Sequence, residues 1–349
     1  MLFFILAVLS IGLFALYSAT REYYSNAVFL RQAGWMLAGL LTLFIVLTAD
    51  YHRFVGLSYV LYAINIVLLV LVLFIGQTRG GAHRWINLGV FNLQPSELVK
   101  ITLILALSAY MGKRKNQATG LKFALGAFLL AVPAVFLILI EPDLGGAVIF
   151  IPVIFAMLFM AGAKVIHLAG IAALGFVSLP FLWHFLRDYQ KQRLFVFLNP
   201  NIDPLGSGYT VIQSKIAVGS GGVFGKGWLS GTQNQLNFLP ERHTDFIFSV
   251  IGEEWGFLGA LVLLLAYLFI IYRAAKILEN TPDVYGRLIV AGFLSLFALQ
   301  VIVNIGMAIG FLPIVGLTLP LVSYGGSSLI VTLMSLGFIL NVGMRRSLF

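Results

Sequence analysis

The sequence predicts an all-α, polytopic integral membrane protein with about ten transmembrane helices. Hydrophobic residues make up 60% of the chain and charged residues only 10%, whereas soluble domains are roughly 45–50% apolar. The apolar residues also form runs of about 20, the length that lets a helix cross the hydrocarbon core. The runs cover residues 1–18, 34–49, 54–75, 95–112, 123–141, 143–161, 164–186, 245–272, 284–310 and 320–342.

The first run has neither a basic segment before it nor a clear small-residue cleavage site, so we expect a retained span rather than a signal peptide. We expect residues 1–349 to form a single transmembrane domain. The chain contains no cysteine, which excludes disulfides and thiolate metal sites, and its five histidines show no metal-ligand spacing.

The basic residues indicate topology. A formal net charge of +9 would suggest nucleic acid in a soluble chain, but in a membrane protein Lys and Arg concentrate in cytoplasmic loops, and we predict no nucleic-acid partner. If the N-terminus is cytoplasmic, the short outer loops hold Arg21, Arg31, Arg79 and Arg84. The inner loops and tail hold Arg53, Lys113, Arg114, Lys115, Lys122, Lys164, Arg273, Lys276, Arg287, Arg345 and Arg346. This bias predicts that both ends are cytoplasmic.

The fourth run, 95–112, places an acid and a base in one helix. Pro95 suits the first helical turn, and the helix dipole favours Glu97 beside it. Glu97 and Lys100 lie three positions apart on one face, so they can pair. The alternative is a dipole-stabilised glutamate beside a lysine that extends to the membrane surface.

The fifth and sixth runs meet at EPDLGG, where Glu141 and Asp143 flank Pro142. Two carboxylates at this outer turn could hold a divalent cation with waters or simply solvate the turn. Without further partners, the residues favour solvation.

Residues 187–244 form the one long gap between runs, an extracytoplasmic loop between the seventh and eighth helices. A loop of this length is usually functional or a linker. Within it, YTVIQSKIAVG (209–219) is amphipathic and suits the membrane interface. GSGGVFGKG (219–227) resembles a phosphate-binding P-loop but lacks its first Gly and its hydroxyl residue. We expect a flexible turn with Lys226 at a basic tip, although its N–H groups could still meet a phosphate.

The stretch FLPERHTDFIFSVIGEEWG carries several charges into the eighth span. If Pro240 begins the helix, Asp245 lies in its second turn at the outer face; alternatively, Thr244 or Asp245 is only an N-cap. An N-cap does not explain Glu253 and Glu254, which lie about 12–14 Å deeper. The set predicts a polar cavity in the outer leaflet.

The last two runs contain NIGMAIGFLPIVGLTLPLVSYGGSS (304–328). Its small residues permit close helix packing, and its prolines and glycines allow broken helices that line a cavity. Ser323, Tyr324 and Ser327 could add hydrogen bonds.

Several blocks of the sequence carry a family resemblance. One block consists of Asn304, Pro313, Gly316, Pro320 and SYGGSS at 323–328. The others are RWI (84–86), QPSE (94–97) with Lys100, EPDLG (141–145) and GTQNQLNFLPERHTDFIFSVIGEEWGFLG (231–259). Together and in order they resemble the SEDS family (shape, elongation, division and sporulation), the polytopic bacterial group that contains RodA and FtsW. The resemblance covers essentially the whole chain. The sequence of residues 232–248 is more similar to the RodA branch than to the FtsW branch.

The resemblance implies an integral-membrane peptidoglycan glycosyltransferase of the bacterial cytoplasmic (inner) membrane, with an extracytoplasmic active site. Such proteins polymerise lipid II, a disaccharide-pentapeptide on undecaprenyl pyrophosphate, together with a class B penicillin-binding protein, for cell-wall elongation and cell shape. In the family, the acidic residue in the position of Asp245 is proposed to be essential for catalysis. Glu97 and Lys100 match positions that line the family's central cavity.

Glycan polymerisation needs a base for the acceptor hydroxyl and positive charge for the departing pyrophosphate. We predict Asp245 as the base. Candidates for substrate binding are Arg84, Glu97, Lys100, Arg193, Lys215, Lys226, Arg242, Ser323 and Tyr324. Glu97 and Lys100 could instead hold a cavity open as a structural pair. A divalent cation, Mg²⁺ or Mn²⁺, could serve the leaving group.

Two other functional classes compete with this prediction. A lipid II flippase would need headgroup contacts in both leaflets, whereas the charged and glycine-rich features lie on the outer side. A non-catalytic scaffold that activates a penicillin-binding protein would make Asp245 a helix cap, whose loss costs about 1 kcal/mol.

Overall fold

The computed structural model describes residues 1–21, 27–79, 82–87, 89, 92–204 and 206–345. Their contacts divide the chain into two compact units. The first unit consists of Met1–Leu37, Phe181–Arg273 and Ala298–Leu329. The second consists of Ala38–Pro180, Ala274–Phe297 and Ile330–Phe349.

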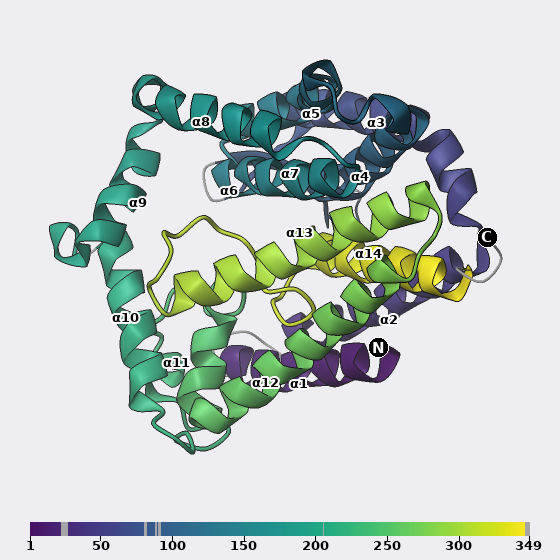
Figure 1. The fold of residues 1–349 in the computed structure, drawn as a ribbon. Helices are drawn as coiled ribbons and strands as arrows, with labels where there is room; N and C mark the ends of the chain where they lie inside the picture. The colour runs from purple at the N-terminus through teal and green to yellow at the C-terminus, as the bar shows by residue number, and fades with distance from the viewer. Residues whose placement is uncertain (22–26, 80–81, 88, 90–91, 205, 346–349) are drawn as a thin grey trace. The chain divides into compact units, whose positions relative to one another are not determined.

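The first unit contains α1 (Leu2–Thr20), the start of α2 (Ala27–Thr48), most of α12 (Ile247–Glu279) and the end of α13 (Val284–Ala308). The segment predicted as a long loop, 187–244, contains several helical pieces (Figure 1). They are α9 (Asp188–Leu198), η3 (Pro200–Ile202), α10 (Ser207–Ser220) and α11 (Thr232–Gln235), preceded by η2 (Trp183–Phe185). Helix α10 includes the amphipathic piece 209–219.

The second unit contains most of α8 and α14 together with the helices of the central sequence. These are α3 (Tyr51–Ile75), α4 (Pro95–Lys113), η1 (Lys115–Gln117), α5 (Leu121–Ile140), α6 (Leu144–Val148), α7 (Phe150–Met160), α8 (Val165–Leu182) and α14 (Gly326–Arg345). A small antiparallel sheet, in the order β1 (Gln77–Arg79), β2 (Ala82–Asn87) and β3 (Asn92–Leu93), joins α3 to α4. The sequence does not predict the sheet, because such short strands leave no apolar run.

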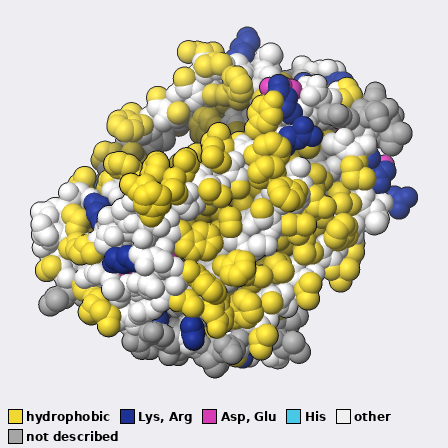
Figure 2. All heavy atoms as spheres, turned by 90° about the horizontal axis from the view of Figure 1, so that it is seen from below, with side chains coloured by type: hydrophobic (Ala, Val, Ile, Leu, Met, Phe, Trp, Pro, Cys, Tyr) yellow, Lys and Arg dark blue, Asp and Glu magenta, His cyan; other side chains and the backbone are white. Residues whose placement is uncertain are grey.

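The helices confirm the polytopic membrane fold. Among the described residues, α1, α2, α3, α5, α12, α13 and α14 are long and apolar enough to cross a membrane. The shorter apolar segments Leu144–Met160 and Val165–Phe181, together with α4, account for the remaining predicted runs. Apolar side chains such as Phe3 and Phe74 are exposed, and Figure 2 shows hydrophobic side chains over much of one face. Such a surface suits lipid rather than water.

The N-terminal boundary of α2 differs clearly from its prediction. Helix α2 begins at Ala27, whereas the predicted run begins at 34. Arg31 and Gln32 interrupt the apolar run but not the helix, since straight-chain polar residues are good helix formers.

Helix α12 is broken at Gly256, whose φ of 64° and ψ of −161° are not helical. Residues 221–227, called here the glycine clasp, bond to the helix on both sides of the break. The bonds are Phe257 N to Gly222 O (2.9 Å), Leu258 N to Val223 O (3.1 Å), Lys226 N to Glu253 O (3.0 Å) and Gly227 N to Glu254 O (3.0 Å). The clasp thus satisfies backbone groups that the break would leave unpaired. This corrects the prediction of a flexible turn, because the glycines serve close backbone approach.

Candidate functional site

Residues 309–325, called here the 309–325 loop, connect α13 to α14 without regular structure. The chain turns at Gly310 and Gly316, whose φ angles of 78° and 73° suit glycine. The loop buries the apolar side chains of Leu317, Leu319, Leu321 and Val322. The last span therefore begins at Gly326 and not at residue 320, because these turns and the loop's prolines prevent a helix.

Asp245 lies in a turn of residues 241–246, called here the Asp245 turn. The N–H groups of 244–246 converge on Glu241 O at 3.1–3.3 Å, and α12 begins only at Ile247. The prediction that Asp245 occupies the second turn of the helix is therefore wrong. The cause is Glu241, whose φ of 51° lies outside the right-handed helical region. Thr244 Oγ1 donates to Glu241 O at 3.2 Å, back along the turn.

The Asp245 turn is docked on the 309–325 loop through main-chain carbonyls. The Tyr324 N–H donates to His243 O at 2.9 Å, and the Ser323 hydroxyl donates to Thr244 O at 2.5 Å. The Ser323 hydroxyl also accepts the Leu319 N–H at 2.8 Å. Ser323 and Tyr324, predicted as hydrogen-bonding residues, thus attach the turn to the loop.

One neighbouring residue, Gln32, was missed in the sequence. Gln32 Nε2 donates to Ser323 O at 3.1 Å, and Gln32 Oε1 accepts the Gly325 N–H at 3.3 Å. The sequence feature that could have indicated Gln32 is its position beside an apolar run, where a polar side chain needs a hydrogen-bond partner. Burial lowers the pKa of His243, and the nearby Glu241 opposes this shift.

One acidic and two basic side chains lie against the same part of the 309–325 loop. Asp245 Oδ2 lies 3.7 Å from the position that a β-carbon on Gly316 would take. Arg193 of α9 donates from Nη1 to Ile314 O at 3.3 Å, and the side chain of Lys215 of α10 lies against Gly310. The structure therefore brings Asp245, Arg193 and Lys215 to residues 310–316.

The other two basic candidates of the first unit are engaged elsewhere. Lys226 Nζ contacts Glu253 Oε1 and Thr232 Oγ1, both at 2.8 Å. Arg242 is buried; its Nε donates to Ala19 O at 2.8 Å and its Nη1 to Asn237 Oδ1. These contacts give both side chains a role in holding the loop segment 226–242.

Glu253 and Glu254 are buried and hydrogen-bonded, which corrects the prediction that they line an open polar cavity. Glu253 accepts hydrogen bonds from Lys226, the Thr232 hydroxyl and the N–H groups of 233–234. Glu254 accepts from the Ser18 hydroxyl at 2.5 Å and from Asn234 Nδ2 at 3.2 Å. The two carboxylates therefore anchor residues 226–235 to α12.

We expect Glu253→Ala to lower the free energy of unfolding by about 3 kcal/mol, because two backbone N–H groups and Lys226 lose their acceptor. Glu279→Ala is the matched control: its carboxylate also lies 2.8 Å from a lysine, Lys276, but at an exposed position, so a loss below about 1 kcal/mol is expected. Thermal unfolding of both purified variants measures the difference. Equal losses would show that Glu253 is not an anchor.

In the second unit, Glu97 and Lys100 form the predicted pair, with Lys100 Nζ 2.5 Å from Glu97 Oε1. Pro95 occupies the start of α4, as predicted. Lys100 is only 3% exposed, so it does not extend to the membrane surface. Glu97 Oε2 and Ser96 Oγ are buried without a hydrogen-bond partner among the described residues. The pair is therefore a buried charged group with spare acceptor capacity.

Arg84 of β2 closes the turn between α5 and α6. Its Nε donates to Glu141 O at 2.8 Å, its Nη2 donates to Pro142 O, and its Nη1 lies 3.9 Å from Asp143 Oδ1. Asp143 caps α6 by accepting the Gly146 N–H at 3.1 Å. Within the part of the chain that the structure describes, no group of three or more His, Cys, Asp or Glu is placed to hold a metal ion. A guanidinium thus occupies the turn for which the sequence allowed a divalent cation.

Glu141 differs from its neighbours because its carboxyl is buried, and neither oxygen has a partner among the described residues. Burial raises its pKa to about 8, the nearby Asp143 reinforces this shift, and Arg84 opposes it. Glu141 is therefore mostly protonated at neutral pH in the folded protein.

We expect the thermal stability of the wild-type protein to fall between pH 5 and pH 8 more than that of Glu141→Gln. The unfolded chain releases the Glu141 proton near pH 4.5, while the folded protein keeps it until about pH 8, so rising pH favours unfolding across this window. The amide of the Gln variant does not titrate. Parallel pH dependences of the two melting temperatures would contradict this assignment.

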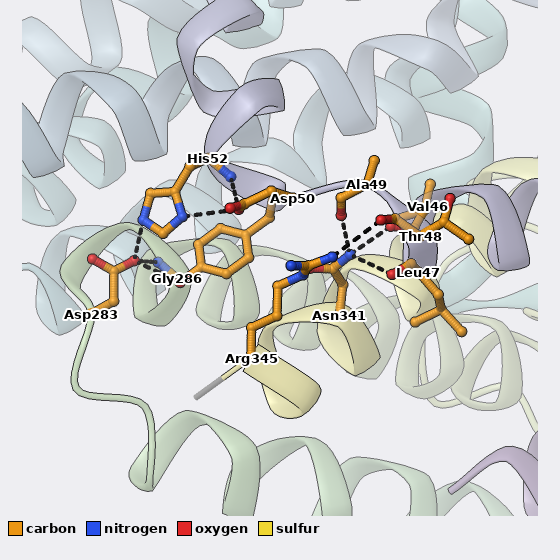
Figure 3. A network of polar contacts seen from close by, with 11 residues as sticks. Val46, Leu47, Thr48, Ala49, Asp50, His52, Asp283, Gly286, Asn341 and Arg345 are labelled. Carbon is orange, nitrogen blue, oxygen red and sulfur yellow. Dashed lines mark hydrogen bonds and ion pairs between the residues drawn. The ribbon is translucent and has the colours of Figure 1, made fainter. Parts of the chain in front are cut away.

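A polar network joins α2, α3, α13 and α14 within the second unit (Figure 3). His52 Nδ1 lies 3.0 Å from Asp50 Oδ1, and His52 Nε2 lies 3.5 Å from Asp283 Oδ2. Asn341 Nδ2 donates to Val46 O at 2.5 Å and to Ala49 O at 2.6 Å (Figure 3). Asn341 thereby ties α14 to the end of α2.

A family model shows what these segments belong to. The model FTSW_RODA_SPOVE, described as a cell cycle protein, matches residues 1–348. The chain belongs to this family. The FTSW_RODA_SPOVE match includes every motif block and every candidate residue named above.

Known proteins of similar sequence and structure agree with this assignment to the FTSW_RODA_SPOVE family. The chain is 39% identical over 351 residues to the peptidoglycan glycosyltransferase MrdB of Escherichia coli K12, covering 100% of this chain and 94% of that protein. It matches a chain of a structure that concerns the coordination of polymerization and crosslinking by a peptidoglycan synthase complex, with a TM-score of 0.84 and 38% identity, covering 99% of this chain and 97% of that chain. It also matches the rod shape determining protein RodA of Thermus thermophilus, with a TM-score of 0.74 and 35% identity, covering 99% and 96%.

In this FTSW_RODA_SPOVE protein the candidate residues fall into three groups. Those of the first unit that meet at the 309–325 loop are Asp245, Arg193, Lys215, Ser323 and Tyr324. Those engaged within 226–242 are Lys226 and Arg242. Those of the second unit are Arg84, Glu97 and Lys100.

Proposed function

We propose that this protein is a peptidoglycan glycosyltransferase that polymerises lipid II into glycan strands, with Asp245 as the general base. The observation that carries this proposal is the arrangement on the 309–325 loop, where one carboxylate and two basic side chains each lie against a residue between 310 and 316. The names of similar proteins, such as the peptidoglycan glycosyltransferase MrdB, support the same activity.

The proposed reaction is a substitution at the anomeric carbon of the lipid-linked donor. The Asp245 carboxylate accepts the proton of the acceptor hydroxyl, and the hydroxyl oxygen forms the new glycosidic bond. The bond between the anomeric carbon and the pyrophosphate oxygen breaks, and its electron pair leaves with undecaprenyl pyrophosphate. Arg193 and Lys215 bring positive charge to this leaving group, Arg as a two-point donor and Lys as a point charge.

The other polar candidates receive different roles in this proposal. Lys226 and Arg242 hold the loop that precedes the Asp245 turn, and Arg84 holds the α5–α6 turn, because each of these side chains donates to at least two protein acceptors. Glu97 and Lys100 remain candidates for substrate binding or for a structural pair. Mg²⁺ or Mn²⁺ stays a prediction from the sequence; the described residues offer it no cluster of ligands, and no step above uses it.

The proposal extends to location and partner. The excess of Lys and Arg in alternate loops supports cytoplasmic termini and an extracytoplasmic site, and the similarity to bacterial proteins such as MrdB supports the bacterial cytoplasmic membrane. We propose a class B penicillin-binding protein as partner. This is supported by the similar chain from a peptidoglycan synthase complex, in which polymerization is coordinated with crosslinking.

The test is glycan polymerisation from labelled lipid II by the purified chain with its cognate class B penicillin-binding protein. Polymer is expected only when the active chain is present. A parallel assay of lipid II movement across proteoliposomes tests the flippase alternative, which predicts transport without polymer. A scaffold predicts that polymer formation depends on the partner's own active site and is unaffected by changes at Asp245.

A further inference from the structure

Asn304 is a fully buried residue of α13 whose side chain contacts both the Asp245 turn and the 309–325 loop. It is 0% exposed. Its Nδ2 donates to Leu317 O at 2.7 Å and to Asp245 O at 2.9 Å. An amide nitrogen carries two hydrogens, so one side chain can bridge two carbonyl oxygens. The acceptors also fix the orientation of the amide, because its oxygen could not bond to either carbonyl.

The two bridged carbonyls belong to the two segments that form the site. Leu317 follows Gly316 in the 309–325 loop, and Asp245 carries the carboxylate. Ser323 and Tyr324 hold the carbonyls of the two residues before Asp245. Asn304 holds the carbonyl of Asp245 itself, which is one bond from the Cα that bears the side chain.

The geometry around Gly316 shows what this bridge controls. Gly316 has a φ of 73°, and a β-carbon there would lie 3.7 Å from Asp245 Oδ2. Holding the Asp245 carbonyl restrains rotation about the bond between Cα and the carbonyl carbon, and this limits the directions that the Cα–Cβ bond can take. The bridge to Leu317 holds Gly316 in place on the other side. The carboxylate is thus directed by main-chain contacts and not by a bond to its own oxygens alone.

The chemistry of Asn304 fits positioning better than packing alone. Its Oδ1 is buried without a hydrogen-bond partner among the described residues, a cost that an apolar side chain would avoid. An apolar side chain of similar size, however, would release both carbonyls. The amide therefore supplies the two donors at the expense of one unpaired acceptor.

We infer that Asn304 is a positioning residue that aims the Asp245 carboxylate at the acceptor hydroxyl. This inference rests on the proposed function of Asp245 as base. It concerns how the base is oriented, and it assigns Asn304 no contact with substrate.

Asn341 offers a matched control within the same chain. It is also buried, its Nδ2 also donates to backbone carbonyls, those of Val46 and Ala49 and, at 3.4 Å, that of Leu47, and its Oδ1 also lacks a partner among the described residues. It belongs to the second unit and ties α14 to α2, whereas Asn304 ties α13 to the Asp245 turn. Asn304→Ala and Asn341→Ala therefore remove the same chemistry at different places.

The experiment compares both variants with wild type and Asp245→Asn in lipid II polymerisation, using the chain with its partner and correcting for the folded fraction. Asn304→Ala is expected to lower kcat at least about tenfold with KM nearly unchanged, since misorientation of a base acts on the chemical step. Asn341→Ala is expected to keep kcat within about twofold. Equal kcat values for the two variants would overturn the inference. If Asn304→Ala does not fold, Asn304→Ser, which keeps one donor, is measured against the same control and the same criterion.

A second readout separates this inference from the proposed function. Modification of Asp245 by a water-soluble carbodiimide and an amine, followed by mass spectrometry, reports the accessibility of the carboxylate without any activity. Asn304→Ala is expected to change the modification rate at Asp245 at least about threefold relative to Asn341→Ala. An unchanged modification rate would overturn the role of Asn304 as a positioning residue. A wild-type protein that forms no polymer overturns the proposed function instead, while the modification rates still decide the role of Asn304.

Discussion

Asp245→Asn is expected to lower the rate of glycan polymerisation by about 10²-fold or more, the usual contribution of a general base. The substitution preserves size and leaves the backbone contacts of the turn intact, because Tyr324, Ser323 and Asn304 all bind main-chain carbonyls. It replaces the carboxylate by an amide, which does not accept the proton of the hydroxyl. The melting temperature and the copurification of the partner are expected to match those of wild type.

Glu241→Gln provides the control for the Asp245 substitution. Glu241 is an exposed acid of the same turn, and its carboxylate accepts a hydrogen bond from the Thr244 hydroxyl at 3.1 Å. An amide oxygen can accept the same bond, so polymerisation is expected to stay within about twofold of wild type. Full polymerisation by Asp245→Asn, or equal losses in the two variants, would remove Asp245 from the role of base. Time courses with labelled lipid II under single-turnover conditions measure both rates.

Gly256→Ala is expected to cause the largest loss of stability, more than about 3 kcal/mol. Its φ of 64° and ψ of −161° lie in a region that essentially only glycine occupies. A β-carbon would also lie 2.7 Å from Val223 O and 2.8 Å from Phe224 C. Both atoms are backbone of the glycine clasp, so they cannot rotate away. The clasp must separate from α12, and its four hydrogen bonds across the break are lost with it.

Gly56→Ala is the matched control for the clasp prediction. Gly56 lies inside α3, and a β-carbon there would meet no atom within 4 Å. Alanine is a better helix former than glycine by about 1 kcal/mol, so this variant is expected to be as stable as wild type or slightly more stable. Thermal unfolding and size-exclusion profiles in detergent measure both variants. A Gly256→Ala protein as stable as Gly56→Ala would show that the break in α12 tolerates a side chain.

The sequence predicted those features that depend on neighbours within one helix. A membrane span is a local property of about 20 residues, and the ten predicted runs correspond to helices or helix pairs of the structure. The Glu97–Lys100 pair was predictable because its residues lie three positions apart on one helix face. The sheet β1–β3 and the helices within 187–244 were not, since short or mixed segments carry weak periodicity.

In the candidate site, too, some features follow from the local sequence and others only from the tertiary structure. The sequence by itself determined the membrane class, the motif blocks and the choice of Asp245 as the leading acid, because residue type and order carry that information. Only the tertiary structure decided that Arg193 and Lys215 reach the 309–325 loop while Lys226 and Arg242 bind elsewhere. It also decided that Glu253 anchors a loop and that Asn304 holds the Asp245 carbonyl. These contacts join residues from about 20 to more than 200 positions apart, and such pairings depend on how the elements pack, which no local pattern specifies.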